Sequence, residues 1–141
     1  MNDRALASYR QTAARGATPL GQVVALYDAV LRDFFRALAA LKAGNVAERV
    51  EHLNHAISVI GYLANVLDHE QGGKVARQLA GVYTASIGMI VQANAKASTA
   101  AIDELIEIYG DLRQAWYQAE QKLAEQKRAQ QKLKEGGLKT P

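Results

Sequence analysis

The stretch DHEQGGKVA, Asp68 to Ala76, has the residue types that come closest to a chemical site in this sequence. A phosphate-binding loop has the pattern GxxxxGK followed by Ser or Thr, and it follows a strand. Here Val75 follows Lys74, no glycine lies five residues before Gly73, and the preceding segment has a helical pattern. We therefore expect no phosphate binding and interpret Gly72-Gly73 as the turn that reverses the chain between two helices.

The histidines offer a second possible chemistry. His52 and His55 are three residues apart on one helix face, which is the spacing of a surface metal pair. A carboxylate-bridged di-iron bundle needs Glu-x-x-His on two helices, but Asn54 stands three residues after Glu51. The chain has no cysteine and no nucleophile elbow around a serine. We expect solvated histidines, no metal, no cofactor and no catalytic residue.

Length and composition limit the class of protein. The chain has 141 residues, 49% of them hydrophobic, which suits one ordinary domain with a buried core. The sequence contains no run of 18 apolar residues, so we predict no membrane span. The N-terminal residues have no apolar h-region, so we expect no secretory signal.

The net positive charge is concentrated at the C-terminal end of the sequence. Six of the 17 Lys/Arg and three of the 14 Asp/Glu lie from Glu120 onward, which leaves eleven of each before it. The body is therefore neutral and has no electrostatic footprint for nucleic acid. Two interpretations of the basic tail stay open, a solvated helix and a contact for an anionic partner.

Four amphipathic helices follow from the apolar spacing of threes and fours. Thr18-Pro19 begins the first helix, and Gly44 ends it before Asn45 caps the second. The second helix runs from about residue 46 to 67, the third from about 73 to 95, and the fourth starts near 98–99. Gly136-Gly137 should end the fourth. The sequence predicts an all-α, antiparallel up-down four-helix bundle over 18–119, with an N-terminal helix or arm at 1–17 and a basic helical extension and tail at 120–141.

Several residues on these helices have a predicted place. Tyr62 falls opposite the apolar stripe of its helix. Gly81 and Gly88 lie inside the third helix, where each costs about 1 kcal/mol relative to alanine. Close helix approach would offset that cost, either inside the bundle or on an exposed strip where a partner helix lies. Four aromatic residues on the stripes are expected in the core: Tyr27, Tyr83, Tyr109 and Trp116.

The order of short segments resembles a known family. A lone Tyr9 precedes ATPLGQVVALYDAVL, LDHEQGGKVARQLAGVY, QAN at 92–94, ID at 102–103 and LRQAWYQA. Together these segments, covering residues 9 to about 119, resemble the flagellar secretion chaperones called FliS. The resemblance implies a cytoplasmic four-helix bundle, not an enzyme, that binds the disordered C-terminal segment of flagellin. It further implies that the bundle prevents early polymerisation and assists delivery to the flagellar type III export apparatus.

The resemblance also implies where the client binds. Flagellin would fold into helices in apolar grooves, and the wide apolar faces of the second and third helices supply candidate contacts. Tyr9 would be a plug that covers part of the groove and is displaced by the client. A co-chaperone or an export gate component would be a further partner, and a helical adaptor for a different client, co-chaperone or regulatory factor is the alternative function. The candidate client-binding residues are Tyr9, Leu53, Ala56, Ile57, Val59, Ile60, Leu63, Val66, Val82, Ile87, Met89 and Val91.

Overall fold

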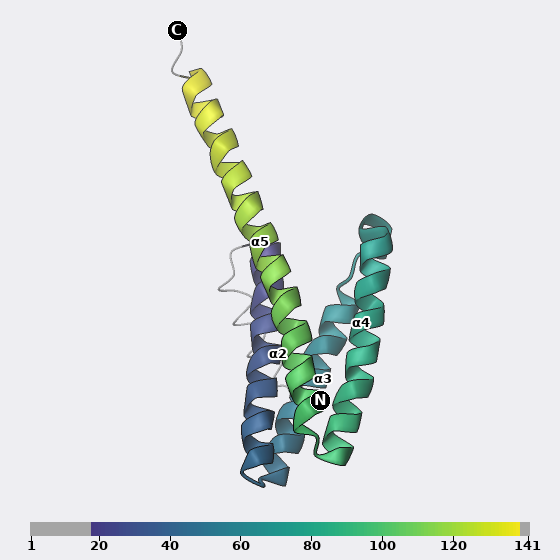
Figure 1. The fold of residues 1–141 in the computed structure, drawn as a ribbon. Helices are drawn as coiled ribbons and strands as arrows, with labels where there is room; N and C mark the ends of the chain where they lie inside the picture. Colours follow the sequence, from purple (N-terminus) through teal and green to yellow (C-terminus); the bar gives the residue numbers. More distant parts are fainter. Residues whose placement is uncertain (1–17, 139–141) are drawn as a thin grey trace.

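The chain forms a bundle of four helices. The computed structural model describes residues 18–138, and in that range it has helices and no strand. The helices are α2 (Pro19–Lys42), α3 (Val46–Asn65), α4 (His69–Lys96) and α5 (Thr99–Leu138). Each helix runs opposite to the one before it (Figure 1), and both α2 and α4 pack against α3 and α5. The all-α class is confirmed, while the N-terminal arm and Tyr9 lie outside the described residues.

Local capping residues place three of the helix starts. The side chain of Thr18 accepts a hydrogen bond from a backbone amide in the first turn of α2, with Pro19 at the first helical position. Gly44 has φ 72°, and Asn45 then caps α3. The hydroxyl of Ser98 accepts a backbone amide at the start of α5. These predicted boundaries are confirmed.

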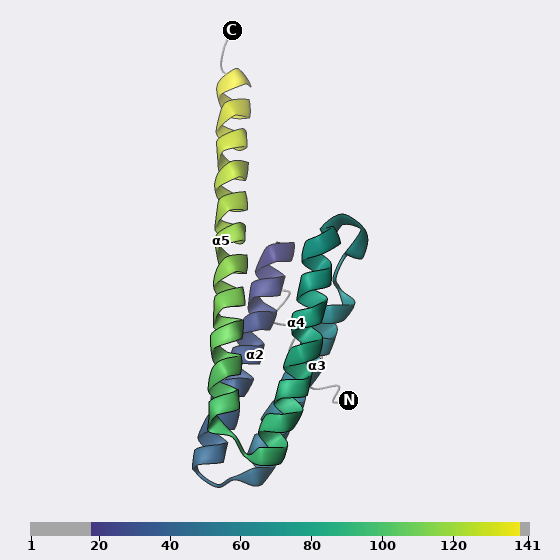
Figure 2. The ribbon, with the colours of Figure 1, turned by 45° about the vertical axis from the view of Figure 1, so that its right-hand side comes forward.

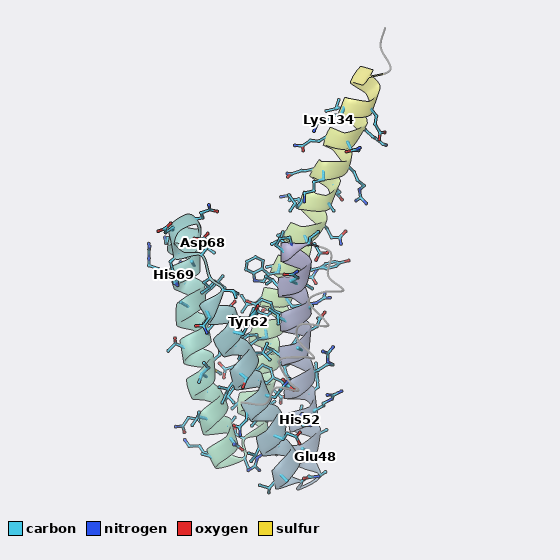
Figure 3. All side chains as sticks on the ribbon, turned by 180° about the vertical axis from the view of Figure 1, so that it is seen from behind. Glu48, His52, Tyr62, Asp68, His69 and Lys134 are labelled. Atoms are coloured by element: carbon cyan, nitrogen blue, oxygen red, sulfur yellow. The ribbon has the colours of Figure 1, made fainter. Side chains whose placement is uncertain are left out.

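The connection between α3 and α4 differs from its prediction. The chain turns at residues 66–68, before the glycine pair, and Asp68 caps α4 by accepting the amides of Glu70 and Gln71 at 3.1 and 3.0 Å. Asp68 and His69 lie together at this end of the bundle (Figure 3). Gly73 has φ 49° and ψ −121°, which makes a kink in the first turns of α4. The predicted positive φ in the glycine pair is confirmed at Gly73, but the start of α4 was predicted too late, because Asp68 caps a first turn before the glycines.

Aromatic residues fill the centre of the bundle. Phe34 of α2 meets Tyr109 of α5 edge-on, with ring centroids 5.6 Å apart, and Tyr27 meets the same ring at 5.8 Å. Tyr83 of α4 is also buried, and Trp116 packs against this core. The predicted core positions of Tyr27, Tyr83 and Tyr109 are confirmed, as is the exposure of Tyr62, whereas Trp116 is only half-buried beside the core.

Polar contacts fix α2 against its two neighbours. Arg113 of α5 donates to Asp28 at 2.8 Å. Asp33 is buried and contacts Nδ1 of His55, while Nδ1 of His52 lies 3.8 Å from its other oxygen. Burial raises the pKa of the Asp33 carboxyl, and the hydrogen bond with His55 lowers it in part. The prediction of solvated histidines was wrong for His52 and His55, because both rings turn inward to this carboxylate, and it is confirmed for the exposed His69. The described residues hold no cluster suited to a metal ion.

The two interior glycines of α4 lie on its outer surface. Gly81 and Gly88 are exposed, and a Cβ added to either would meet nothing within 4 Å in the described part of the chain. Close packing inside the bundle was one of the two interpretations of these residues, and it was wrong. The glycines therefore weaken the helical preference of α4 without a packing gain inside the bundle.

The last helix continues far beyond the other three. α5 runs as one straight helix past the ends of α2 and α4 (Figures 1 and 2). It includes Gly136-Gly137, so the prediction that these glycines end the helix was wrong. Their cost as helix formers is modest and no other element competes for them there. No helix within residues 18–138 is long and apolar enough to cross a membrane.

A stability test follows from the end of α4. Ala97 caps this helix in the left-handed region, with φ 49°. Because a Cβ disfavours that conformation, Ala97→Gly should raise the free energy of unfolding by about 1 kcal/mol. The matched control is Ala85→Gly at an exposed interior position of α4, which should lower it by about 1 kcal/mol. Denaturant unfolding measures both, and a loss of stability in Ala97→Gly would contradict the assignment of the cap.

Candidate binding grooves beside α4

An apolar groove lies at the end of the bundle where α4 begins. We call it the end groove; its volume is about 220 Å³. Val66 and Val75 at its edge are 51% and 60% exposed, which is high for apolar side chains next to one another on adjacent helices. All four helices contribute to its lining, which consists of Val23, Leu63, Val66, Leu67, Asp68, Gly72, Val75, Ala76, Leu79, Tyr83 and Trp116.

The groove exists because α4 and α5 diverge at this end. Figures 1 and 2 both show α4 separated from α5 near its start, while the two helices meet at the opposite end. The kink at Gly73 lies in this diverging part. Val75 and Leu79 belong to the apolar stripe of α4, but here no helix covers them fully. The stripe therefore becomes the wall of an open groove.

Tyr83 lines this groove, and it joins Tyr27 and Tyr109 of the core in a group of buried tyrosines that we call the tyrosine floor. The hydroxyls of Tyr27 and Tyr83 share a 2.5 Å hydrogen bond, and within the described residues the buried hydroxyl of Tyr109 has no hydrogen-bond partner at ordinary geometry. Burial raises the pKa of all three phenols, above all at Tyr83 and Tyr109. The hydrogen bonds that Tyr27 makes with Tyr83 and Trp116 lower its pKa in part. The floor is therefore neutral at physiological pH and suits an apolar ligand.

A second groove runs between α3 and α4 towards the other end of the bundle. This α3–α4 groove has a volume of about 450 Å³. Arg49 crosses it at one end, donating to the side chain and the backbone oxygen of Asn94 at 3.1 and 3.3 Å. Its lining is apolar between polar ends and consists of Arg49, Val50, Asn54, Ile57, Ile90, Val91, Asn94 and Ala95.

The predicted client-binding residues within 18–138 separate into four groups. Leu63 and Val66 line the end groove, and Ile57 and Val91 line the α3–α4 groove. The half-buried Val82, Ile87 and Met89 line neither groove. The remaining described residues are core side chains without an open face, since each is fully enclosed by neighbouring helices: Leu53, Ala56, Val59 and Ile60. The expectation that these four form an exposed groove wall was wrong.

The sequence also missed residues that line the end groove. Val23, Val75 and Trp116 fall on apolar stripes, and from spacing alone they were expected in the core. Spacing identifies the inward face of a helix but not the place where two helices diverge. A signal was present in the glycine pair, because a kink near a helix start changes the direction of the chain.

The family model described as "Flagellar protein FliS" matches residues 1–123. The chain belongs to the FliS family. The matched range includes every residue that lines the two grooves, and it ends inside α5.

Named FliS proteins agree with this assignment. The flagellar secretion chaperone FliS of Campylobacter jejuni is 32% identical over 115 residues, which cover 82% of this chain and 90% of that protein. The Vibrio cholerae protein of the same name is 31% identical over 102 residues, covering 72% and 75%. The Salmonella typhimurium protein is 31% identical over 113 residues, covering 79% and 84%. FliS is a family of chaperones and not of enzymes, which supports a chaperone role for this chain.

Alkaline titration tests the tyrosine floor. The folded-state pKa values of Tyr27, Tyr83 and Tyr109 are raised, so their contribution to stability is fully present below about pH 10, the unfolded value, and is lost as pH rises above it. We expect three of the six tyrosines to form phenolate only together with loss of the helical circular dichroism signal. In denaturant all six should titrate near pH 10. If all six tyrosines formed phenolate near pH 10 while the helices stayed intact, the burial of Tyr27, Tyr83 and Tyr109 would be contradicted.

Proposed function

We propose that this chain is a cytoplasmic export chaperone that binds the disordered C-terminal segment of flagellin. The bound segment would be unable to polymerise early and would be delivered to the flagellar type III export apparatus. The observation that carries this proposal is the pair of apolar grooves beside α4. Membership of a family of flagellar secretion chaperones supports the flagellar client.

The groove geometry suits a helical client. An amphipathic helix buries one apolar face in such a groove through side chains one turn apart. The end groove offers Val66 and Val75 at its edge and Trp116 in its lining, and the α3–α4 groove offers Ile57 and Val91. A segment that is disordered when free must gain several kcal/mol to offset its ordering, so contact with both grooves would favour tight binding.

Calorimetry with the flagellin C-terminal segment tests the proposal. We expect a complex with a negative heat capacity change, because apolar surface is buried on binding. Val75→Glu should weaken binding by about tenfold or more, which corresponds to about 1.4 kcal/mol, since it places a charge in the apolar contact. The matched control is Val46→Glu, at a position of similar exposure, 56%, outside both grooves.

Two outcomes would contradict the proposal. Absence of heat and of a complex at tens of micromolar would leave the alternative of a helical adaptor for a different client, which co-purification would then identify. Equal weakening by both glutamate variants would exclude the end groove as the contact.

Tyr9 gives a separate prediction about the N-terminal arm. If its ring plugs part of the groove until the client displaces it, Tyr9→Ala should tighten client binding by a few-fold, since competition is removed. The arm should also become more mobile, which nuclear magnetic resonance relaxation would measure. Tyr9→Phe keeps the ring and should behave as wild type. Unchanged affinity and unchanged arm mobility in Tyr9→Ala would exclude the plug.

A further inference from the structure

The part of α5 that extends beyond the bundle, residues 124–138, offers a further surface near the end groove, and we call it the arm. The family match ends at residue 123, and α5 continues to Leu138. This arm projects from the same end of the bundle at which α4 begins, and therefore from the end that holds the end groove (Figures 1 and 2). Lys134 lies far along it, clear of the other helices (Figure 3).

One face of the arm continues directly from the groove. Trp116 lines the end groove and so marks the side of α5 that faces it. At about 100° per residue, Leu123 and Lys127 lie about 20° to either side of Trp116 around the helix, and Lys134 lies about in line with it. At about 1.5 Å per residue this row extends about 27 Å from Trp116 to Lys134.

The charges of the arm separate around this row. Glu125 lies about 180° from Trp116 and Glu135 about 100° from it, so neither shares the groove-side face. Glu120 lies about 40° from Trp116 on the groove-side face, but it is half-buried next to Gly21 of α2. Lys127 and Lys134 are exposed and form no ion pair within residues 18–138. Beyond Leu123, the charged side chains within about 60° of Trp116 are therefore Lys127 and Lys134, which are both basic.

The rest of the arm does not favour other kinds of partner. Leu123 and Leu133 lie about 80° apart with no further large apolar residue between them, so the arm lacks the stripe that a helix needs to lie on a membrane. The other faces of the arm carry glutamates as well as lysine and arginine, which does not favour binding of nucleic acid. A partner that continues from Trp116 along this face passes the half-buried Glu120 and then meets Lys127 and Lys134.

We propose that the client helix held in the end groove continues along this row, and that its carboxylates pair with Lys127 and Lys134. The inference rests on the proposed function, and it adds the chemistry of the client segment: an apolar stripe followed by acidic residues on the same face. The arm is thus an electrostatic extension of the end groove. Because the pairs are exposed, salt weakens them, and binding is tightest at low ionic strength.

Charge reversal on the full-length chain tests this extension. The variant Lys127→Glu/Lys134→Glu should weaken binding of the flagellin C-terminal segment by about tenfold at about 0.05 M salt. The matched control is Arg128→Glu/Lys132→Glu, which makes the same charge change about 120° and 160° away from Trp116. The control should change affinity by less than about twofold. The difference between the two variants should disappear at about 0.5 M salt.

The outcomes separate this inference from the function on which it rests. If wild type binds the segment and both variants behave alike, the arm makes no specific contact and the inference fails while the proposed function stands. If wild type does not bind the segment, the proposed function itself fails. Circular dichroism of both variants should match wild type, because all four positions are exposed.

Discussion

The hydrogen bond between Tyr27 and Tyr83 in the middle of the bundle is the constraint on which the other features depend. The two residues come from α2 and α4, which pack against α3 and α5 on either side. Two phenol rings placed end to end hold these helices at the distance of two long side chains. Removing either hydroxyl would leave a buried polar atom without its partner, which is costly in an apolar interior. The bundle therefore keeps α4 at a fixed distance from α2, where it cannot close over the core along its full length.

Both grooves lie beside α4. α4 touches α3 and α5 but does not cover the ends of their apolar stripes, so the end groove opens where α4 diverges and the α3–α4 groove opens beside Ile57 and Val91. The polar contacts are concentrated on the other side of the molecule, where Asp33 meets the two histidines and Asp28 meets Arg113. On the α4 side, Arg49 donates to Asn94 at one end of the α3–α4 groove, and the linings of the two grooves are otherwise mostly apolar.

The sequence predicted the fold because the fold depends on local rules. Apolar spacing located the four helices, and Thr18, Gly44, Asn45 and Ser98 located their ends. The site was harder, because a groove depends on where helices separate, and Val75 has the same spacing as a core residue. The inward turn of His52 and His55 was missed for a related reason, since the carboxylate that attracts them lies on another helix. Residue spacing contains no information about such distant contacts.

The outer glycines of α4 have a consequence for how the bundle fluctuates. Gly81 and Gly88 make the formation of this helix less favourable, and nothing in the described bundle packs against them to offset that cost. Local opening is easiest where helical propensity and burial are both low. Amide hydrogens of α4 should therefore exchange with solvent before those of α2 and α3, as a separate cooperative unit. The wall shared by the two grooves is then also the part of the bundle that can adjust to a client at the least cost.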